Sequence, residues 1–302
     1  MSFAALLLTP PLPGSLAVLF VALFLPVVLS LFRFVPGVVE SRLWTRIHAT
    51  LNYPAAFGSR HREPVANLGQ MPTRGQALYI FLISILNIVL CIVPVPYKQP
   101  NNSFPGDLEQ ALCVIGDRAG GLAMANMVAV FLFSTRNNVL ISLTNWSHST
   151  FLLLHRWIAY WVIIHSCFHS AMLLALYKIE GMYDSDSKSN WWTWGIVATI
   201  ISVAIWPLSV LPLRARAYEL FLAGHQILVA LFLVGVFLHI YYLFTYDWGY
   251  EVRLSLCSSS VECLALTADL GLCGWGHLVR RPHLAPPPRR VQWCPYGSRH
   301  PH

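Results

Sequence analysis

The fold is decided by two apolar stretches, LHRWIAYWVIIHSCFHS (154–170) and RARAYELFLAGHQILVALFLVGVFLH (214–239). Each stretch holds two histidines that lie 14 residues apart. They are His155 and His169 in the first stretch, and His225 and His239 in the second. In an α-helix, 14 residues turn through about 1400°, roughly 40° short of four full turns, and rise about 21 Å. The two stretches therefore predict two helices that each carry two histidines on one face, one above the other.

The composition places most of the chain in lipid. Of its 302 residues, 56% are hydrophobic and 11% are charged, and the mean hydropathy is +0.56. A soluble domain carries roughly 25% charged residues, so an ordinary soluble enzyme is excluded. The net charge of +7 comes almost wholly from arginines that lie between apolar runs. We therefore expect a lipid bilayer, and no nucleic acid, as the partner of the basic residues.

Six apolar segments are long enough to cross a bilayer, which takes roughly 20 helical residues. They span about 15–33, 76–97, 119–135, 151–177, 192–212 and 217–244. The sequence thus predicts an all-α polytopic membrane protein with about six transmembrane helices around a helical-bundle core.

Arginine-rich and arginine-poor connections alternate between these segments. The rich ones hold Arg33, Arg42, Arg46, Arg60, Arg62 and Arg74, then Arg136, then Arg214 and Arg216. Because arginine-rich loops stay in the cytoplasm, this predicts an extracellular or lumenal N-terminus. We expect the plasma membrane or the vacuolar membrane as the location.

The two histidine-bearing segments cross in the same direction, so their histidines match in depth. His155 and His225 fall near the arginine-rich, inner side, and His169 and His239 near the outer side. Imidazole is a good iron ligand, and haem takes one axial ligand on each face. The pattern therefore predicts two His–His clamps for two b-type haems. The alternative for any one of these histidines is a hydrogen-bonded core residue.

Other residues in these segments are candidates for supporting roles. His165 lies four residues before His169 and competes with it as a ligand; we interpret His165 as a residue beside the outer haem. Arg156 follows His155 and is a candidate partner for a haem propionate, or else for the membrane interface. The tryptophans Trp191, Trp192 and Trp194 are interpreted as an aromatic belt.

A family resemblance extends over roughly residues 75–251. The two opening stretches, together with DRAGGLAMANMVAVFLFSTRNNVLISLTNWSHSTFLLLHRW (117–157), resemble the ferric-reductase transmembrane domain. The likeness is to fungal ferric-chelate reductases, which are related to the NADPH oxidases. It implies that His155 and His225 hold the inner haem and that His169 and His239 hold the outer one. The equal spacing of 14 favours the metalloreductase branch over the oxidases.

The resemblance also implies an oxidoreductase that passes electrons through two b-type haems to a ferric chelate, with no catalytic acid or base. Family members use FAD and NADPH, for which this sequence shows no binding domain. We therefore expect a flavoprotein donor in trans or a missing C-terminal domain. Iron, copper and oxygen all stay open as acceptors. The alternatives are a non-catalytic haem-binding cytochrome subunit, a superoxide-generating oxidase-like protein and a histidine-dependent transporter.

Three regions follow from this interpretation. Residues 1–75 form an N-terminal transmembrane helix and a basic cytoplasmic loop, and residues 76–251 form the diheme domain. Residues 252–302 form an atypical tail with three consecutive prolines and no sustained helical period. We expect this tail to be non-helical or disordered. The alternative is that a frame or splice difference produced it.

Overall fold

The computed structural model describes residues 11–58, 64–65, 69–93 and 106–269, with side chains described only as far as 243. Within these ranges, six helices are long and apolar enough to cross a membrane. They are α2 (Pro11–Leu31), α5 (Arg74–Ile92), α6 (Asp107–Ser134), α8 (His148–Ile179), α10 (Asn190–Leu208) and α12 (Tyr218–Asp269). The prediction of an all-α polytopic membrane protein with six spans is confirmed.

Two of the spans that begin at the arginine-bearing end, α5 and α8, start at polar caps. Thr73 accepts from the backbone N–H of Gln76, and the Gln76 side chain accepts from the N–H of Thr73, which closes a capping box before α5. Ser147 caps α8 by accepting from the N–H of Thr150. These caps satisfy amide groups that the first turn of a helix leaves without partners. They therefore fix where the spans begin.

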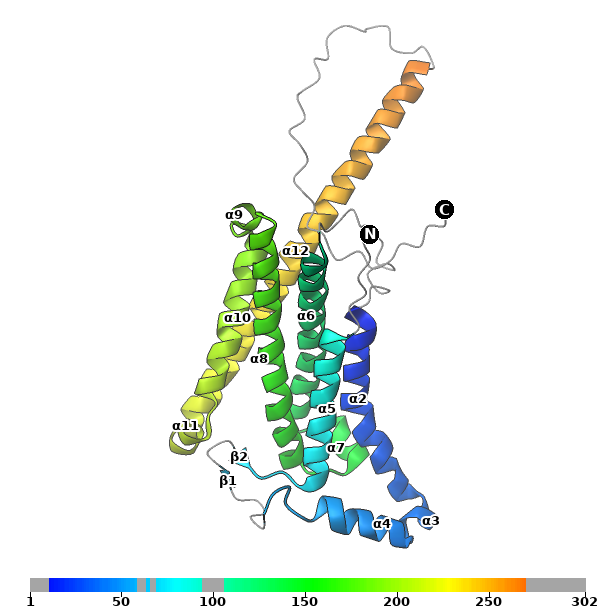
Figure 1. Cartoon of the computed structure of the whole chain (residues 1–302), viewed down its shortest axis with the longest axis vertical. Helices are drawn as coiled ribbons and strands as arrows, with labels where there is room; N and C mark the ends of the chain where they lie inside the picture. The colour runs from blue at the N-terminus through cyan, green and yellow to red at the C-terminus, as the bar shows by residue number, and fades with distance from the viewer. Residues whose placement is uncertain (1–10, 59–63, 66–68, 94–105, 270–302) are drawn as a thin grey trace.

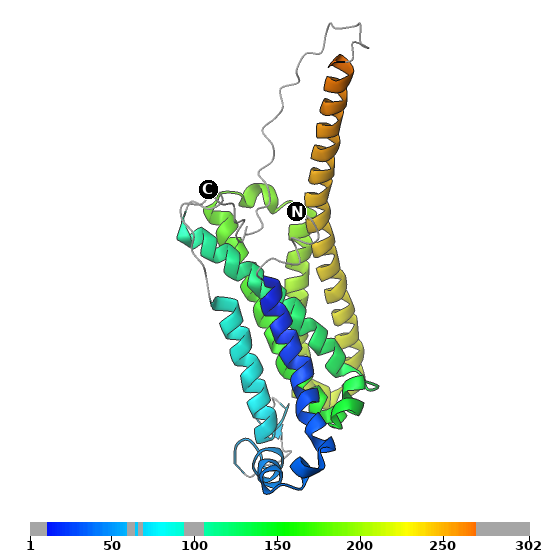
Figure 2. The same cartoon turned by 90° about the vertical axis from the view of Figure 1, so that its right-hand side faces the viewer.

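The spans pack as a bundle built on two antiparallel hairpins, α6 with α8 and α10 with α12. Figure 1 shows these helices side by side, and Figure 2 shows α2 and α5 on one flank of the bundle. Helix α8 also packs against α10, which joins the two hairpins. The largest buried cluster lies where α2, α5, α6 and α8 meet, and includes Ala22, Ile83 and Phe133.

Short elements close the two ends of the bundle (Figure 1). One end, here called the arginine side, carries α3 (Pro36–Val39), α4 (Arg42–Ile47), η2 (His48–Asn52), α7 (Val139–Thr144) and α11 (Leu211–Arg216). The opposite end, here called the far side, carries α9 (Tyr183–Asp186). A 3-10 turn, η1 (Phe32–Phe34), follows α2, and two-residue strands β1 (Pro64–Val65) and β2 (Gly69–Gln70) pair antiparallel.

The structure differs from the sequence-based boundaries at four helices. Helix α5 ends at Ile92, before the predicted residue 97, because Val93 is already extended. Helix α6 begins at Asp107, well before the predicted residue 119, because the adjacent glycines at 120 and 121 do not interrupt it. Helix α10 ends at Leu208, where Ser209 caps it, instead of at 212. Helix α12 continues to Asp269, so the expectation of a non-helical tail from 252 is wrong over 252–269.

The reason lies in the local sequence. Residues 250–269 contain neither glycine nor proline, the two strongest helix breakers, and glycines return only from 271. The three consecutive prolines of the tail, at 286–288, lie outside the described residues.

Candidate functional site

The four histidines predicted from the 14-residue spacing meet as two pairs between α8 and α12. The ring centres of His155 and His225 are 6.4 Å apart, and those of His169 and His239 are also 6.4 Å apart. All four side chains are partly buried. The first pair, on the arginine side, is called the arginine-side pair, and the second is called the far-side pair.

Each of the four rings is held through its Nδ1 atom. Three donate to backbone carbonyl oxygens: His155 to Val130 at 2.9 Å, His169 to Gly116 at 2.8 Å, and His239 to Trp191 at 2.7 Å. The fourth, His225, has Nδ1 3.2 Å from the hydroxyl of Ser209. A carbonyl only accepts, so it fixes the proton on Nδ1 and leaves the lone pair on Nε2. This is the support that metal-ligating histidines have from surrounding residues.

Glycines make room for the far-side pair. A Cβ atom at position 120 would lie 2.9 Å from Nδ1 of His169, and one at position 195 would lie 2.8 Å from Nδ1 of His239. Each glycine stands four residues after the carbonyl that its histidine uses, Gly116 on α6 and Trp191 on α10. Any other residue would push the ring away from that carbonyl, so these two glycines position the pair.

The arginine-side pair is held at helix ends. Val130 lies in the last turn of α6, and Ser209 is the residue that caps α10. Arg156, partly buried beside His155, lies close enough to Arg214 for the two charges to interact. A second guanidinium group, that of Arg214, therefore lies near the one beside this pair.

An apolar layer separates the two pairs. Val162 and Phe232 lie seven residues from both histidines of their own helix, and both pack with Ala198 of α10. All three are at most 7% exposed. The space midway between the pairs is therefore filled by side chains and closed to water.

His165 lies outside both pairs. Its Nε2 atom donates to Oδ1 of Asn87 at 3.0 Å, and the same oxygen accepts from Nδ2 of Asn126 at 2.6 Å. This buried cluster joins α5, α6 and α8, and Nδ1 of His165 has no hydrogen-bond partner there. The competition between His165 and His169 is thus decided in favour of His169 as the partner of His239, while the ligand role itself stays a prediction.

One predicted belt residue has a different position. Trp191 is only 7% exposed and its ring centre lies 6.3 Å from that of His239. Tyr177 and Trp192 contact it on the other side. Trp191 therefore covers the far-side pair, and only its place near a helix start, followed by a glycine four residues on, could have suggested this from the sequence.

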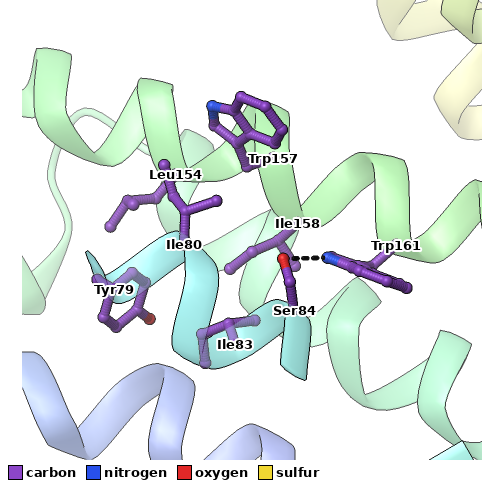
Figure 3. Close-up of a pocket in the computed structure, with 8 residues that line it drawn as sticks. All are labelled: Tyr79, Ile80, Ile83, Ser84, Leu154, Trp157, Ile158 and Trp161. Atoms are coloured by element: carbon purple, nitrogen blue, oxygen red, sulfur yellow. Dashed lines mark hydrogen bonds between the residues drawn. The ribbon is translucent and has the colours of Figure 1, made fainter. Parts of the chain in front are cut away.

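No other site of comparable chemistry occurs in the described ranges. They contain no group of three or more His, Cys, Asp or Glu that could hold a metal ion. A small groove between α5 and α8 is lined mainly by apolar side chains, and its one polar link is Trp161 Nε1 donating to Ser84 Oγ at 3.0 Å (Figure 3). None of the four paired histidines lines it, so the pairs are the candidate site.

The fold and this site define a polytopic helical membrane protein with two histidine pairs stacked between two of its spans. Residues 119–236 match the family model described as "Ferric reductase like transmembrane component". This region of the chain is similar to the ferric reductase transmembrane components. The resemblance noted in the sequence is therefore confirmed.

Curated relatives agree with this assignment. The chain is 25% identical over 229 residues to "Ferric/cupric reductase transmembrane component 1" of Candida albicans, covering 74% of this chain and 30% of that protein. It is 26% identical over 226 residues to "Ferric reductase transmembrane component 3" of Saccharomyces cerevisiae, covering 74% and 32%. The chain thus spans about a third of the length of these relatives. No solved structure matches it.

Proposed function

We propose that the chain carries electrons across a membrane through two b-type haems and reduces ferric chelates. The observation that supports this most directly is the pairing of four histidines at matched depth. In this proposal His155 and His225 hold the inner haem, and His169 and His239 hold the outer one. Residues 76–251 form the electron-carrying unit, and the N-terminus faces the extracellular or lumenal side.

The ring geometry fits a bis-histidine iron site. A metal ion lies about 2 Å from each ligating imidazole nitrogen, and the nitrogen lies roughly 1 Å from its ring centre. Two opposed ligands therefore separate their ring centres by roughly 6 Å, against 6.4 Å in both pairs. The Nδ1 hydrogen bonds leave Nε2 of each ring for the iron. Two ligands alone are too few for a bare ion, which favours a planar macrocycle that supplies the others.

When bound, haem would supply iron that takes up and releases one electron at a time. The chain's own residues orient the histidine rings, exclude water and supply positive charge near the site. The carbonyls of Val130, Gly116 and Trp191 fix the rings, and the layer at Val162 and Phe232 keeps water out. No side chain is needed as a catalytic acid or base. Arg156 and Arg214 supply positive charge that suits carboxylates at the inner site.

The donor and the acceptor follow from the family and not from this chain's geometry. We propose a flavoprotein donor, using FAD and NADPH, that delivers electrons on the arginine side. A ferric chelate takes them on the far side. The relatives' names mention both ferric and cupric reductases, so copper is the second candidate acceptor.

Haem binding is tested with the purified full chain. We expect a reduced-minus-oxidised spectrum with a b-type band and two haems per chain. His225→Ala and His239→Ala should each reduce the content to about one, since each removes one ligand of one pair. His48→Ala, in a turn on the arginine side, is the matched control and should leave both haems bound. A wild-type spectrum without a haem band would contradict the proposal.

Reductase activity is tested separately, by ferric and cupric reduction at the surface of cells that express the chain. A gain over empty cells that His239→Ala abolishes supports the complete proposal. Haem binding without any gain, even with a flavoprotein reductase co-expressed, would instead indicate a non-catalytic cytochrome subunit.

A further inference from the structure

The connection between α2 and α5 crosses the arginine side of the bundle. Figures 1 and 2 show α3 and α4 running crosswise to the spanning helices there, below the end of α2. Helix α2 ends at Leu31 and α5 begins at Arg74. Both are membrane spans, so this connection lies at the level where the span ends and the lipid headgroups begin.

The coil formed by α4 and η2 (residues 42–52) has two outward stripes. Leu43 and Ile47 are one helical turn apart and are 68% and 37% exposed. Arg42 and Arg46 are also one turn apart, both exposed, and lie on the neighbouring stripe. Side chains four residues apart share a helix face, so an apolar row and a cationic row run side by side. Among the described residues, the side chains of Arg42 and Arg46 make no hydrogen bond or ion pair, and most of Leu43 is exposed.

Arg33 adds a third cation at the same level. Its Nη2 atom donates to the Ser142 carbonyl at 3.5 Å, but Nη1 is buried with no hydrogen-bond partner among the described residues. Its guanidinium stands 4.6 Å from the ring centre of Phe34, which is itself 66% exposed. Between 32 and 52 the sequence has one acid, Glu40, against three arginines. The segment therefore presents positive charge beside exposed apolar side chains.

From these observations we propose that residues 33–47 form a docking surface for anionic lipid headgroups of the leaflet on the arginine side. The apolar row of Leu43 and Ile47 enters the boundary between headgroups and acyl chains, as interfacial helices do. The exposed Arg42 and Arg46 bind the lipid phosphates, which guanidinium groups contact in a bidentate way. A soluble acidic partner would match the charge, but it would leave Leu43 and Phe34 in water.

The test uses the purified full chain in a neutral detergent, titrated with short-chain phosphatidylglycerol or phosphatidylcholine. The thermal unfolding midpoint is followed by tryptophan fluorescence. We expect phosphatidylglycerol to raise the midpoint and phosphatidylcholine to leave it nearly unchanged. Because each arginine near an anionic surface strengthens binding about fivefold, Arg42→Gln with Arg46→Gln should weaken the apparent affinity at least tenfold. Neither arginine side chain has a partner among the described residues, so this variant is expected to fold.

The matched control is Lys178→Gln with Lys188→Gln, which removes two exposed cations from the far side and should keep the response. Leu43→Asn should weaken the response with all charges in place. An equal loss in the lysine control, or an equal rise with inorganic phosphate, would overturn the proposal. So would a Leu43→Asn variant that responds like the wild type, because that result would indicate a purely charged surface for an acidic protein.

Discussion

The two histidine pairs have the same ring separation but are supported in different ways. The far-side pair is held by two backbone carbonyls, each followed four residues later by a glycine that the ring touches. The arginine-side pair is held by a carbonyl in the last turn of α6 and by a serine hydroxyl that caps α10. Sequence spacing thus decides which histidines meet, while the neighbouring helices decide how firmly each ring is held.

The difference has a physical consequence. The carbonyls of Gly116, Trp191 and Val130 move only with their helices, whereas the hydroxyl of Ser209 can rotate away from His225. We therefore expect the far-side pair to be lost when a side chain is added at either glycine. The arginine-side pair should tolerate an added side chain nearby but should depend on the hydroxyl of Ser209. Four predictions test this comparison, from the largest expected effect to the smallest.

The largest effect is expected at the glycines. Gly195→Ala and Gly120→Ala each place a methyl group under 3.0 Å from a far-side ring. Because a displaced ring can no longer hold the iron, haem binding at this pair should be lost in both variants. A redox titration should show one component where the wild type shows two. Gly224→Ala is the control, because a Cβ beside His225 meets nothing within 4 Å; a similar loss there would contradict the comparison.

The next effect is expected in the layer between the pairs. Phe232→Ala opens a cavity beside Val162 and Ala198, and large buried aromatic truncations cost about 3 kcal/mol. Because the layer borders both pairs, both redox components should shift together. Unfolding in detergent measures the stability loss. Phe237→Ala, on the same helix but 65% exposed, should cost much less. Equal losses in the two variants would mean that the layer is not closely packed.

A third effect, outside both pairs, is expected at Asn87. Asn87→Ala removes the oxygen that accepts from both His165 and Asn126. His165 Nε2 then lacks a partner and Asn126 Nδ2 keeps only its bond to the Leu122 carbonyl, which should cost about 2 kcal/mol of stability in the membrane domain. Both haem components should persist in the spectrum. Loss of the far-side component would show that His165 acts on that pair after all.

The smallest effect is expected at Ser209. Ser209→Ala removes the partner of His225 Nδ1 and should weaken haem binding at the arginine-side pair about tenfold, or about 1.4 kcal/mol. Ser209→Thr keeps the hydroxyl and should keep the wild-type haem affinity. Only one of the two redox components should respond. An unchanged affinity in the alanine variant would mean that another group orients His225.

Much of the fold was predictable from the sequence, because spans are set by long apolar runs and the arginines mark one end. The pairing of His155 with His225 and of His169 with His239 was predictable as well, from equal spacing in two segments that cross in the same direction. Their role as haem ligands stays a prediction.

The supports of the rings were not predictable. Val130, Gly116 and Trp191 act through backbone carbonyls, which every residue has, so their side chains give no signal. The glycines at 120 and 195 can be read from the sequence, but their role cannot, because it depends on which histidine ring packs against them. Trp191 looked like an interfacial residue because indole suits both the interface and a buried site.

One feature of the hairpins bears on how the protein is made. Every histidine of the two pairs contacts the membrane span that precedes its own span: residues of α6 contact both histidines of α8, and α10 with its capping residue contacts both histidines of α12. During synthesis, each half of the site is therefore complete as soon as its own hairpin has been inserted. The second hairpin then arrives with its rings already oriented toward the first, so the two halves need only meet.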